Sequence, residues 1–347
     1  MNAIYPRTVL VHVSSTESRE LHAFYLDSKT GSLQLLEIVS VPGSGSPTRG
    51  NIPLAWARNG EILYAHVRTA PFPLSAFAVQ PSGKLRLLET VNMPAPMVYL
   101  SATRDGRFLL GVSYDGALVT VNPFKANGCP AVPCLQTLPT PPKPHCIIEV
   151  PFGGFVYVTS VDGDSILVYH LDEASGLLEP VMSATTPTRG RSGPRHLAFH
   201  PTLNRLYCSN EHAGSVGVYR VDRKSGKLHE LQYETVVPPT FTGNALAADI
   251  HLTPDGKFVF ASVRKTNSIV AFHVDPMTGL MSSAGAFEVQ SNPRGFAIDP
   301  TGRFLLCAGQ GSNQVGVYAI DPGSGGLTVV DRHSVGKRPG WIEFAPM

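Results

Sequence analysis

The chain has 347 residues, 43% of them hydrophobic, and its 28 Lys and Arg nearly balance its 26 Asp and Glu. This apolar content supports a large core and excludes a disordered chain, while a formal charge of +2 without any Lys/Arg-rich block argues against a nucleic-acid partner. No apolar run approaches the roughly 18 residues of a membrane span, and the first residues lack the pattern of a signal peptide. We therefore expect a cytoplasmic protein that binds no membrane.

Short apolar runs separated by tight turns fill the chain, which contains 33 Gly and 30 Pro. Five segments share an alternating apolar strand, then Asp, a Ser/Thr-Gly turn and a Leu that begins the next strand. In chain order they span 17–33, 165–178, 215–228, 268–280 and 314–327. A second element, two strands around a Pro-centred or equivalent turn, recurs at 54–68, 99–114, 196–211, 250–264 and 295–310. Such patterns indicate β-strands rather than helices.

Together the two elements make a unit of about 45 to 50 residues with four strands, which is typical of a propeller blade. Counting units predicts an all-β, seven-bladed β-propeller with four antiparallel strands per blade, in one domain over residues 1–347. The segment 337–347 reads as a first strand without a second, and the chain starts with a second strand that lacks a first. Pairing of the N- and C-terminal strands would close the ring and leave no open edge.

Polar residues recur at two places in the unit. Both are counted from the Pro, or the residue in its place, in the turn between the first two strands. Six residues before it, where the innermost strand starts, stand His145, Arg195 and Arg294. Ten residues after it, where the second strand ends, the sequence has Arg68, Tyr114, Glu211, Arg264 and Gln310. Because the second strand runs back antiparallel to the first, both places lie at the same face of the disc. We expect these side chains, with His196, to surround the mouth of the central channel.

Buried arginines need partners, and one glutamate cannot neutralise four of them. The surplus charge predicts an anionic ligand, a carboxylate or a phosphate. The same arginines would repel a cation, so we expect no metal and no cofactor. The sequence contains no nucleophile elbow, HExxH or P-loop.

The segments "GPRHLAFHP", "YCSNE", "ADIHLTPDG", "NPRGFAID", "AGQGSNQVGVY" and "RPGW" resemble the seven-bladed bacterial 6-phosphogluconolactonase family, which also includes carboxymuconate-cyclizing enzymes. The likeness covers essentially the whole chain and is strongest from about 193 to 341, whereas "NGCPAVPC" (127–134) departs from the family pattern. It implies a metal-independent carboxylic ester hydrolase of the pentose phosphate pathway. The implied catalytic residues are His145, Arg195, Glu211 and Arg264, and Arg294, His196 and His251 stand in adjoining family motifs. We expect these last three to bind substrate, together with three residues placed by the repeat, Arg68, Gln310 and Tyr114.

The leading prediction is hydrolysis of a small anionic sugar lactone, with His145 or Glu211 as general base and the arginines as oxyanion and anion clamp. One alternative is a cycloisomerase that forms a lactone from a carboxymuconate-like diacid, and another is a scaffold without catalytic activity. The sequence leaves open which lactone is used, the direction of reaction, and whether the protein is a monomer or a homodimer.

Overall fold

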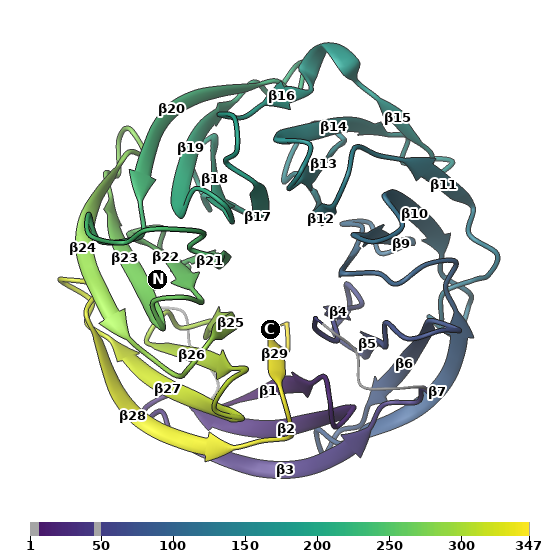
Figure 1. Cartoon of the computed structure of the whole chain (residues 1–347). Helices are drawn as coiled ribbons and strands as arrows, with labels where there is room; N and C mark the ends of the chain where they lie inside the picture. The colour runs from purple at the N-terminus through teal and green to yellow at the C-terminus, as the bar shows by residue number, and fades with distance from the viewer. Residues whose placement is uncertain (1–6, 45–49, 347) are drawn as a thin grey trace.

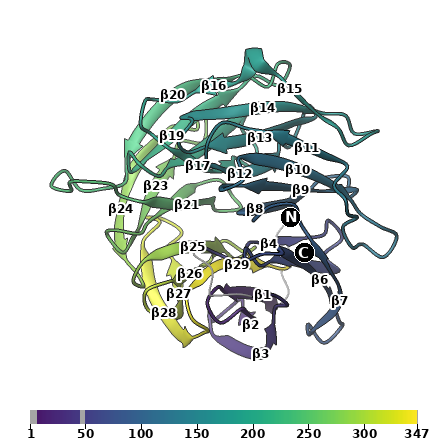
Figure 2. The same ribbon diagram turned by 45° about the vertical axis from the view of Figure 1, so that its right-hand side comes forward.

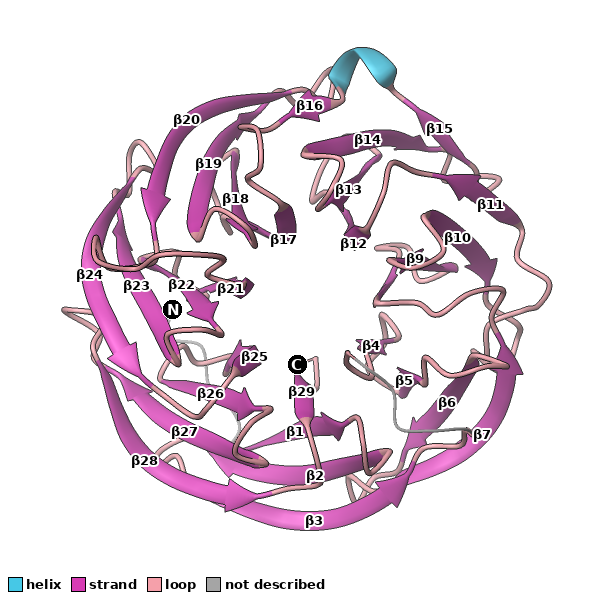
Figure 3. Cartoon of the chain, viewed as in Figure 1, coloured by secondary structure: helices cyan, strands magenta, loops and turns pink. Residues whose placement is uncertain are grey.

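The computed structural model describes residues 7–44 and 50–346. Both ends of the predicted 1–347 domain and residues 45–49 lie outside this range. Seven antiparallel sheets stand in a ring around one axis (Figure 1), and Figure 2 shows the same ring turned by 45°. Strands make up almost all of the regular structure (Figure 3), and the one helix among the described residues is the short 3-10 turn η1 (Met182–Ala184). The predicted seven-bladed propeller is confirmed.

The blades follow one another along the chain, and in each the strand nearest the axis is named first. Blade 1 has β29 (Pro339–Phe344), β1 (Thr8–Ser15), β2 (Glu20–Asp27) and β3 (Leu33–Ser40). Blade 2 has β4 (Leu54–Trp56), β5 (Ile62–His66), β6 (Pro73–Val79) and β7 (Leu85–Asn92). Blade 3 has β8 (Tyr99–Ala102), β9 (Phe108–Ser113), β10 (Leu118–Pro123) and β11 (Gln136–Pro139). Blade 4 has β12 (Pro144–Glu149), β13 (Phe155–Ser160), β14 (Ser165–Leu171) and β15 (Leu178–Pro180), and the short β16 (Thr186–Pro187) also pairs with β14.

The last three blades have the same order. Blade 5 has β17 (Pro194–Phe199), β18 (Arg205–Asn210), β19 (Ser215–Val221) and β20 (Leu228–Thr235). Blade 6 has β21 (Ala247–Leu252), β22 (Phe258–Val263), β23 (Ser268–Val274) and β24 (Met281–Glu288). Blade 7 has β25 (Pro293–Ile298), β26 (Phe304–Gly309), β27 (Gln314–Ile320) and β28 (Leu327–Ser334).

The two ends of the chain meet in blade 1, as predicted. In β1 and β29, Val11 lies opposite Phe344 and Val13 opposite Ile342 in an antiparallel pair. Figure 1 shows this as the yellow C-terminal strand beside the purple N-terminal strand. The pairing closes the ring and occupies the edge that β1 would otherwise expose.

Local chemistry explains the repeated turns, and contacts between neighbouring blades make the core. In the first Asp-Ser/Thr-Gly turn, the Asp27 carboxylate accepts hydrogen bonds from the backbone N–H groups of Lys29 and Thr30. Gly31 follows with φ of +76°, a conformation that glycine adopts without steric cost. Between blades, apolar side chains from facing sheets interdigitate, for example Tyr207 and Val218 of blade 5 with Val259 of blade 6. No helix in the described residues has the length and apolar character needed to cross a membrane.

Candidate active site

A cavity of about 230 Å³ opens where the inner strands begin, near the axis of the ring. Six of the ten predicted site residues line it, namely Arg68, Tyr114, His145, Glu211, Arg264 and Arg294. They belong to blades 2 to 7 and are separated by up to 226 positions in the sequence, since the lining runs from Arg68 to Arg294. The repeat brings them together because each blade presents the start of its first strand and the end of its second at the same face.

Glu211 is the anionic centre of this cavity. It follows β18, and its backbone N–H donates to the carbonyl of Gly193 at 2.7 Å. One carboxylate oxygen forms an ion pair with Arg195 Nε at 2.9 Å and the other with Arg264 Nη2 at 3.1 Å. Burial alone would raise the pKa of Glu211, but the positive charges of Arg195, Arg264 and Arg294 outweigh it and hold the pKa below its ordinary value. Glu211 is therefore ionised and held by arginine on both oxygens.

Arg294 differs from the other arginines of the cavity. Within residues 7–44 and 50–346 it forms no ion pair, and its buried Nε has no hydrogen-bond partner. Burial and the charges of Arg195 and Arg264 lower the pKa of Arg294 well below its ordinary value. A buried cation without a carboxylate is costly unless a ligand supplies the missing charge.

Arg68 is held at the rim by residues that the sequence analysis did not identify. Its Nη2 donates to the Asp115 carboxylate at 3.0 Å, and the Asp115 side chain is 64% exposed. Gly50 also lines the cavity with φ of +114°, and a Cβ there would overlap the Arg68 guanidinium. Asp115 directly follows the repeat position of Tyr114, so a search one residue further along the repeat would have found it. In the described part of the chain, four guanidinium groups thus face two carboxylates and leave two positive charges in excess.

His145 begins β12 and is 2% exposed, with its ring against the edge of Tyr114 at a centroid distance of 5.8 Å. Its Nδ1 is buried and finds no hydrogen-bond partner among the described residues. Burial, and next the charge of Arg195, lower the pKa of His145 well below 6.5. The imidazole is therefore neutral at pH 7 and able to accept a proton.

Arg195 lies behind the cavity rather than in its lining. It is 1% exposed, and besides Glu211 its Nη1 donates to the carbonyl of Ala248 at 2.6 Å. Arg195 therefore holds Glu211 from the buried side. Gln310 lies beside the rim, where its Nε2 donates to the carbonyl of Gly50 at 2.8 Å.

His196 and His251 do not line this cavity. They line a second cavity of about 330 Å³, further along the inner strands, together with Asp249 and Tyr99. The pairing of β17 with β18 is irregular here, because its register shifts between Pro194 and His196. The expectation that His196 surrounds the mouth is corrected on this point.

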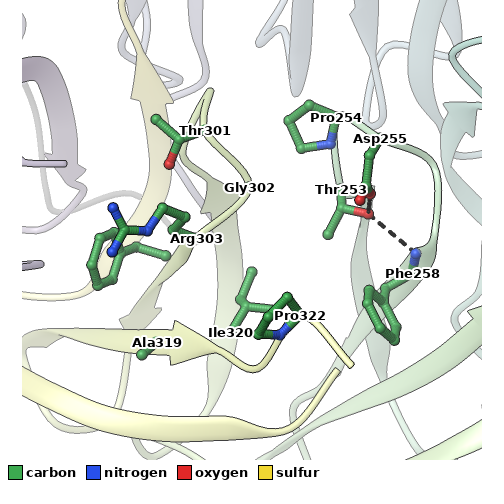
Figure 4. A pocket seen from close by; sticks show the side chains of 11 residues that line it. Thr253, Pro254, Asp255, Phe258, Thr301, Gly302, Arg303, Ala319, Ile320 and Pro322 are labelled. Atoms are coloured by element: carbon green, nitrogen blue, oxygen red, sulfur yellow. Dashed lines mark hydrogen bonds between the residues drawn. The ribbon is translucent and has the colours of Figure 1, made fainter. Parts of the chain in front are cut away.

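A larger cavity, about 490 Å³, lies between blades 6 and 7, at the turns that join the first two strands of each blade (Figure 4). Turn residues such as Thr253, Pro254 and Gly302 form it, and Thr253 accepts a hydrogen bond from the backbone N–H of Phe258 within the turn. An equivalent cavity of the same size lies between blades 2 and 3 at Arg58 and Gly106. Because the groove repeats with the blades, we attribute it to the architecture.

Comparison with known proteins agrees with this geometry. The family model described as "Lactonase, 7-bladed beta-propeller" matches residues 8–344. A 6-phosphogluconolactonase from Pectobacterium carotovorum is 36% identical over 333 residues, which cover 96% of this chain and 97% of that protein. A 6-phosphogluconolactonase from Yersinia pestis is 34% identical, with the same coverage of both chains.

Among solved structures, a periplasmic gluconolactonase from Pseudomonas aeruginosa superimposes with a TM-score of 0.87 and 26% identity. The match covers 98% of this chain and 99% of that one. Shared sequence over nearly the full length and a shared ring of blades lead to one assignment. The chain belongs to the seven-bladed β-propeller lactonase family.

Proposed function

We propose that this protein hydrolyses a small anionic sugar lactone in the cavity lined by His145, Glu211 and Arg294. The observation that carries the proposal is Arg294, a half-buried residue whose buried Nε has no partner and whose guanidinium forms no ion pair in the described residues, in a cluster where four arginines meet two carboxylates. A phosphate or carboxylate on the substrate would supply the missing anion. One charge-assisted hydrogen bond of this kind contributes about 1.5 to 3 kcal/mol.

His145 is the better candidate for the general base. Glu211 has both oxygens engaged in ion pairs with arginines, so neither oxygen is free to take a proton from water. His145 is neutral and lines the same cavity. Binding of an anionic substrate would offset the arginine charges around His145 and make its protonation easier as the reaction proceeds.

In the proposed reaction, His145 takes a proton from a water molecule while the water oxygen bonds to the lactone carbonyl carbon. Arg294 and Arg264 face the cavity and stabilise the negative charge that develops on the carbonyl oxygen. The ring C–O bond then breaks, and the proton on His145 passes to the departing alkoxide. Arg68, at the rim, is placed to hold the anionic tail of the substrate.

The experiment is a panel of lactones at constant pH, with hydrolysis followed as proton release. We expect 6-phosphogluconolactone to be turned over at least about tenfold more efficiently than gluconolactone, because only the former carries an anionic group. A chelator arm tests metal independence, which stays a prediction, and we expect no change on addition of EDTA. Failure to accelerate hydrolysis of any lactone would refute the proposal, and ring closure of a carboxymuconate would favour the cycloisomerase.

A cytoplasmic location likewise stays a prediction, since one similar structure is that of a periplasmic protein. Fractionation of cells that express the untagged chain would decide between the two compartments.

A further inference from the structure

The second cavity, at the other end of β17 and β21, contains an ordered set of ionisable side chains that the proposed chemistry has not used. His196 Nδ1 lies 2.7 Å from one Asp249 carboxylate oxygen, and His251 Nε2 lies 3.4 Å from the same oxygen. The other oxygen accepts a hydrogen bond from the backbone N–H of Phe296 at 3.2 Å. Asp249 is thus held in place and bridges two imidazoles.

His196 connects this cluster with the candidate base. Its ring centroid lies 5.0 Å from that of His145, with the planes tilted by 56°. Within the part of the chain that the structure describes, His145 Nδ1 and His196 Nε2 are both buried and both lack a hydrogen-bond partner. The two nitrogens therefore do not hydrogen-bond to each other, and a water held between the adjacent rings would satisfy both.

The hydrogen bond to Asp249 fixes the form of His196. A carboxylate can only accept, so Nδ1 of His196 carries the hydrogen and Nε2 keeps its lone pair. Through one bridging water, that lone pair can orient a hydrogen on Nδ1 of His145, which leaves Nε2 of His145 as the basic atom. The series therefore runs from the base His145 through the second imidazole of His196 to the carboxylate of Asp249. In a Ser-His-Asp triad, a carboxylate orients the catalytic histidine in the same way.

We propose that His196 and Asp249 are positioning residues for His145, which set its tautomer and stabilise the positive charge it gains during lactone hydrolysis. This inference rests on the proposed function and extends it to a second set of side chains. When Nε2 of His145 takes the proton from water, the hydrogen on Nδ1 moves toward Nε2 of His196. The charge then lies next to the Asp249 carboxylate, which offsets the charge of Arg195, and it returns when the alkoxide is protonated.

The surroundings support this direction of charge movement. His145 is near Arg195, Arg294 and Arg68, which disfavour a cation there. His196 is surrounded by charged or titratable groups from its own strand and from its neighbours: Arg195 on β17, His145 on β12, Asp249 and His251 on β21, and Tyr99 on β8. The ring of Trp341 on β29 also packs against it. Glu343 on β29 lies near His251 and Asp249. Side-chain exposure rises from 7% at His196 to 13% at Asp249 and 40% at His251, so the cluster leads toward solvent.

The first test is kinetic and uses Asp249→Asn and His196→Gln in the full chain with 6-phosphogluconolactone. We expect kcat to fall about 10- to 100-fold in each, with KM changed less than about twofold because neither residue lines the substrate cavity. The acid limb of the kcat profile in Asp249→Asn should move to lower pH, since loss of the carboxylate makes the histidine pair harder to protonate. A merely structural role would not produce that shift.

The matched control is His200→Gln, in the turn after β17. His200 is also buried, but both of its ring nitrogens already bond to backbone groups, of Gly256 and Leu203. We expect this variant to lose stability without losing kcat. Equal loss of kcat in His200→Gln and His196→Gln would overturn the inference.

A second test does not depend on activity or on variants that fold. Nitrogen NMR of ¹⁵N-histidine-labelled wild-type protein should show His196 and His145 as neutral rings protonated at Nδ1, and a His196 ring protonated at Nε2 would overturn the inference. The outcomes also separate the two proposals. If the wild-type protein is inactive on all lactones, the proposed function is refuted. If His145→Ala loses activity while Asp249→Asn and His196→Gln both keep full kcat, only the inference is refuted.

Discussion

The two ends of the central channel receive side chains from the same inner strands, yet they differ in charge balance, because one has surplus positive charge and the other does not. At the end where β12, β17 and β25 begin, guanidinium groups outnumber carboxylates and Arg294 lacks a partner among the described residues. Toward the other end of β17 and β21, each charge is matched, with Asp249 between His196 and His251. The comparison teaches that the repeat fixes where side chains gather, while the residue types at each position along the inner strands decide which chemistry each part of the channel receives.

The largest expected effect is at the cationic end. His145→Ala should lower kcat by about 10² to 10⁴, because it removes the group proposed to take the proton from water. Steady-state kinetics with the phosphorylated lactone measures this loss. His170→Ala, an exposed histidine on β14, is the control and should keep wild-type kcat. If His145→Ala also keeps wild-type kcat, the cavity that contains His145 cannot be distinguished as the catalytic one.

Two arginines at the cationic end should separate activity from stability. Arg195→Ala breaks a buried ion pair with Glu211 and should cost about 3 to 5 kcal/mol of unfolding free energy as well as turnover. Arg294→Ala removes a cation that has no ion pair in the described residues, so it should abolish turnover and leave stability equal or higher. Urea unfolding of both variants measures the difference. A larger stability loss in Arg294→Ala than in Arg195→Ala would contradict the charge assignment.

The sequence predicted the ring because its signals are local. Strand alternation and Asp-containing turns such as that at Asp27 recur at each blade, and the incomplete units at the two ends predicted the β1 and β29 pairing. Two fixed offsets within the repeat were enough to identify six side chains of the cationic cavity.

The remaining features depend on contacts that no repeat encodes. The register of β17 shifts between Pro194 and His196, and a shift of one residue cannot be read from an apolar pattern. The Arg68 and Asp115 pair joins blades 2 and 3, so it appears only when the blades are placed side by side. The short β16 and η1 interrupt the repeat in blade 4 and have no counterpart in the other blades described.

Two histidines, one from each cavity, should also respond to pH in opposite directions. His145 has a lowered pKa, so its contribution to stability is present above pH 6.5 and is lost as the pH falls below that value. His251 has a raised pKa because Asp249 outweighs its burial, so its contribution is present below pH 6.5 and is lost as the pH rises through the folded-state pKa. Each effect is worth at most about 1.4 kcal/mol per pH unit.

Urea unfolding of wild type, His145→Gln and His251→Gln at pH 5, 6, 7 and 9 tests this contrast. His251→Gln should cost more stability at pH 6 than at pH 9, and His145→Gln should reduce the loss of stability between pH 7 and pH 5. The same slope for both variants would show that the two ends are electrostatically alike.

The smallest expected effect concerns the rim of the cationic cavity. In Gly50→Ala the added Cβ would overlap the guanidinium of Arg68, which must then move away from Asp115. If Arg68 holds the anionic tail of the substrate, KM for the phosphorylated lactone should rise about 3- to 10-fold while kcat changes little, as expected when only ground-state binding is weakened.

Gly243→Ala is the matched control, because Gly243 has a similar positive φ of +99° but no atom within 4 Å of the added Cβ. Both variants bear the cost of an alanine at positive φ, so a KM increase confined to Gly50→Ala isolates the displacement of Arg68 from backbone strain. An equal increase in KM for the unphosphorylated lactone would instead assign Arg68 to the lactone ring, and the anionic tail would then be held by Arg264 and Arg294 alone.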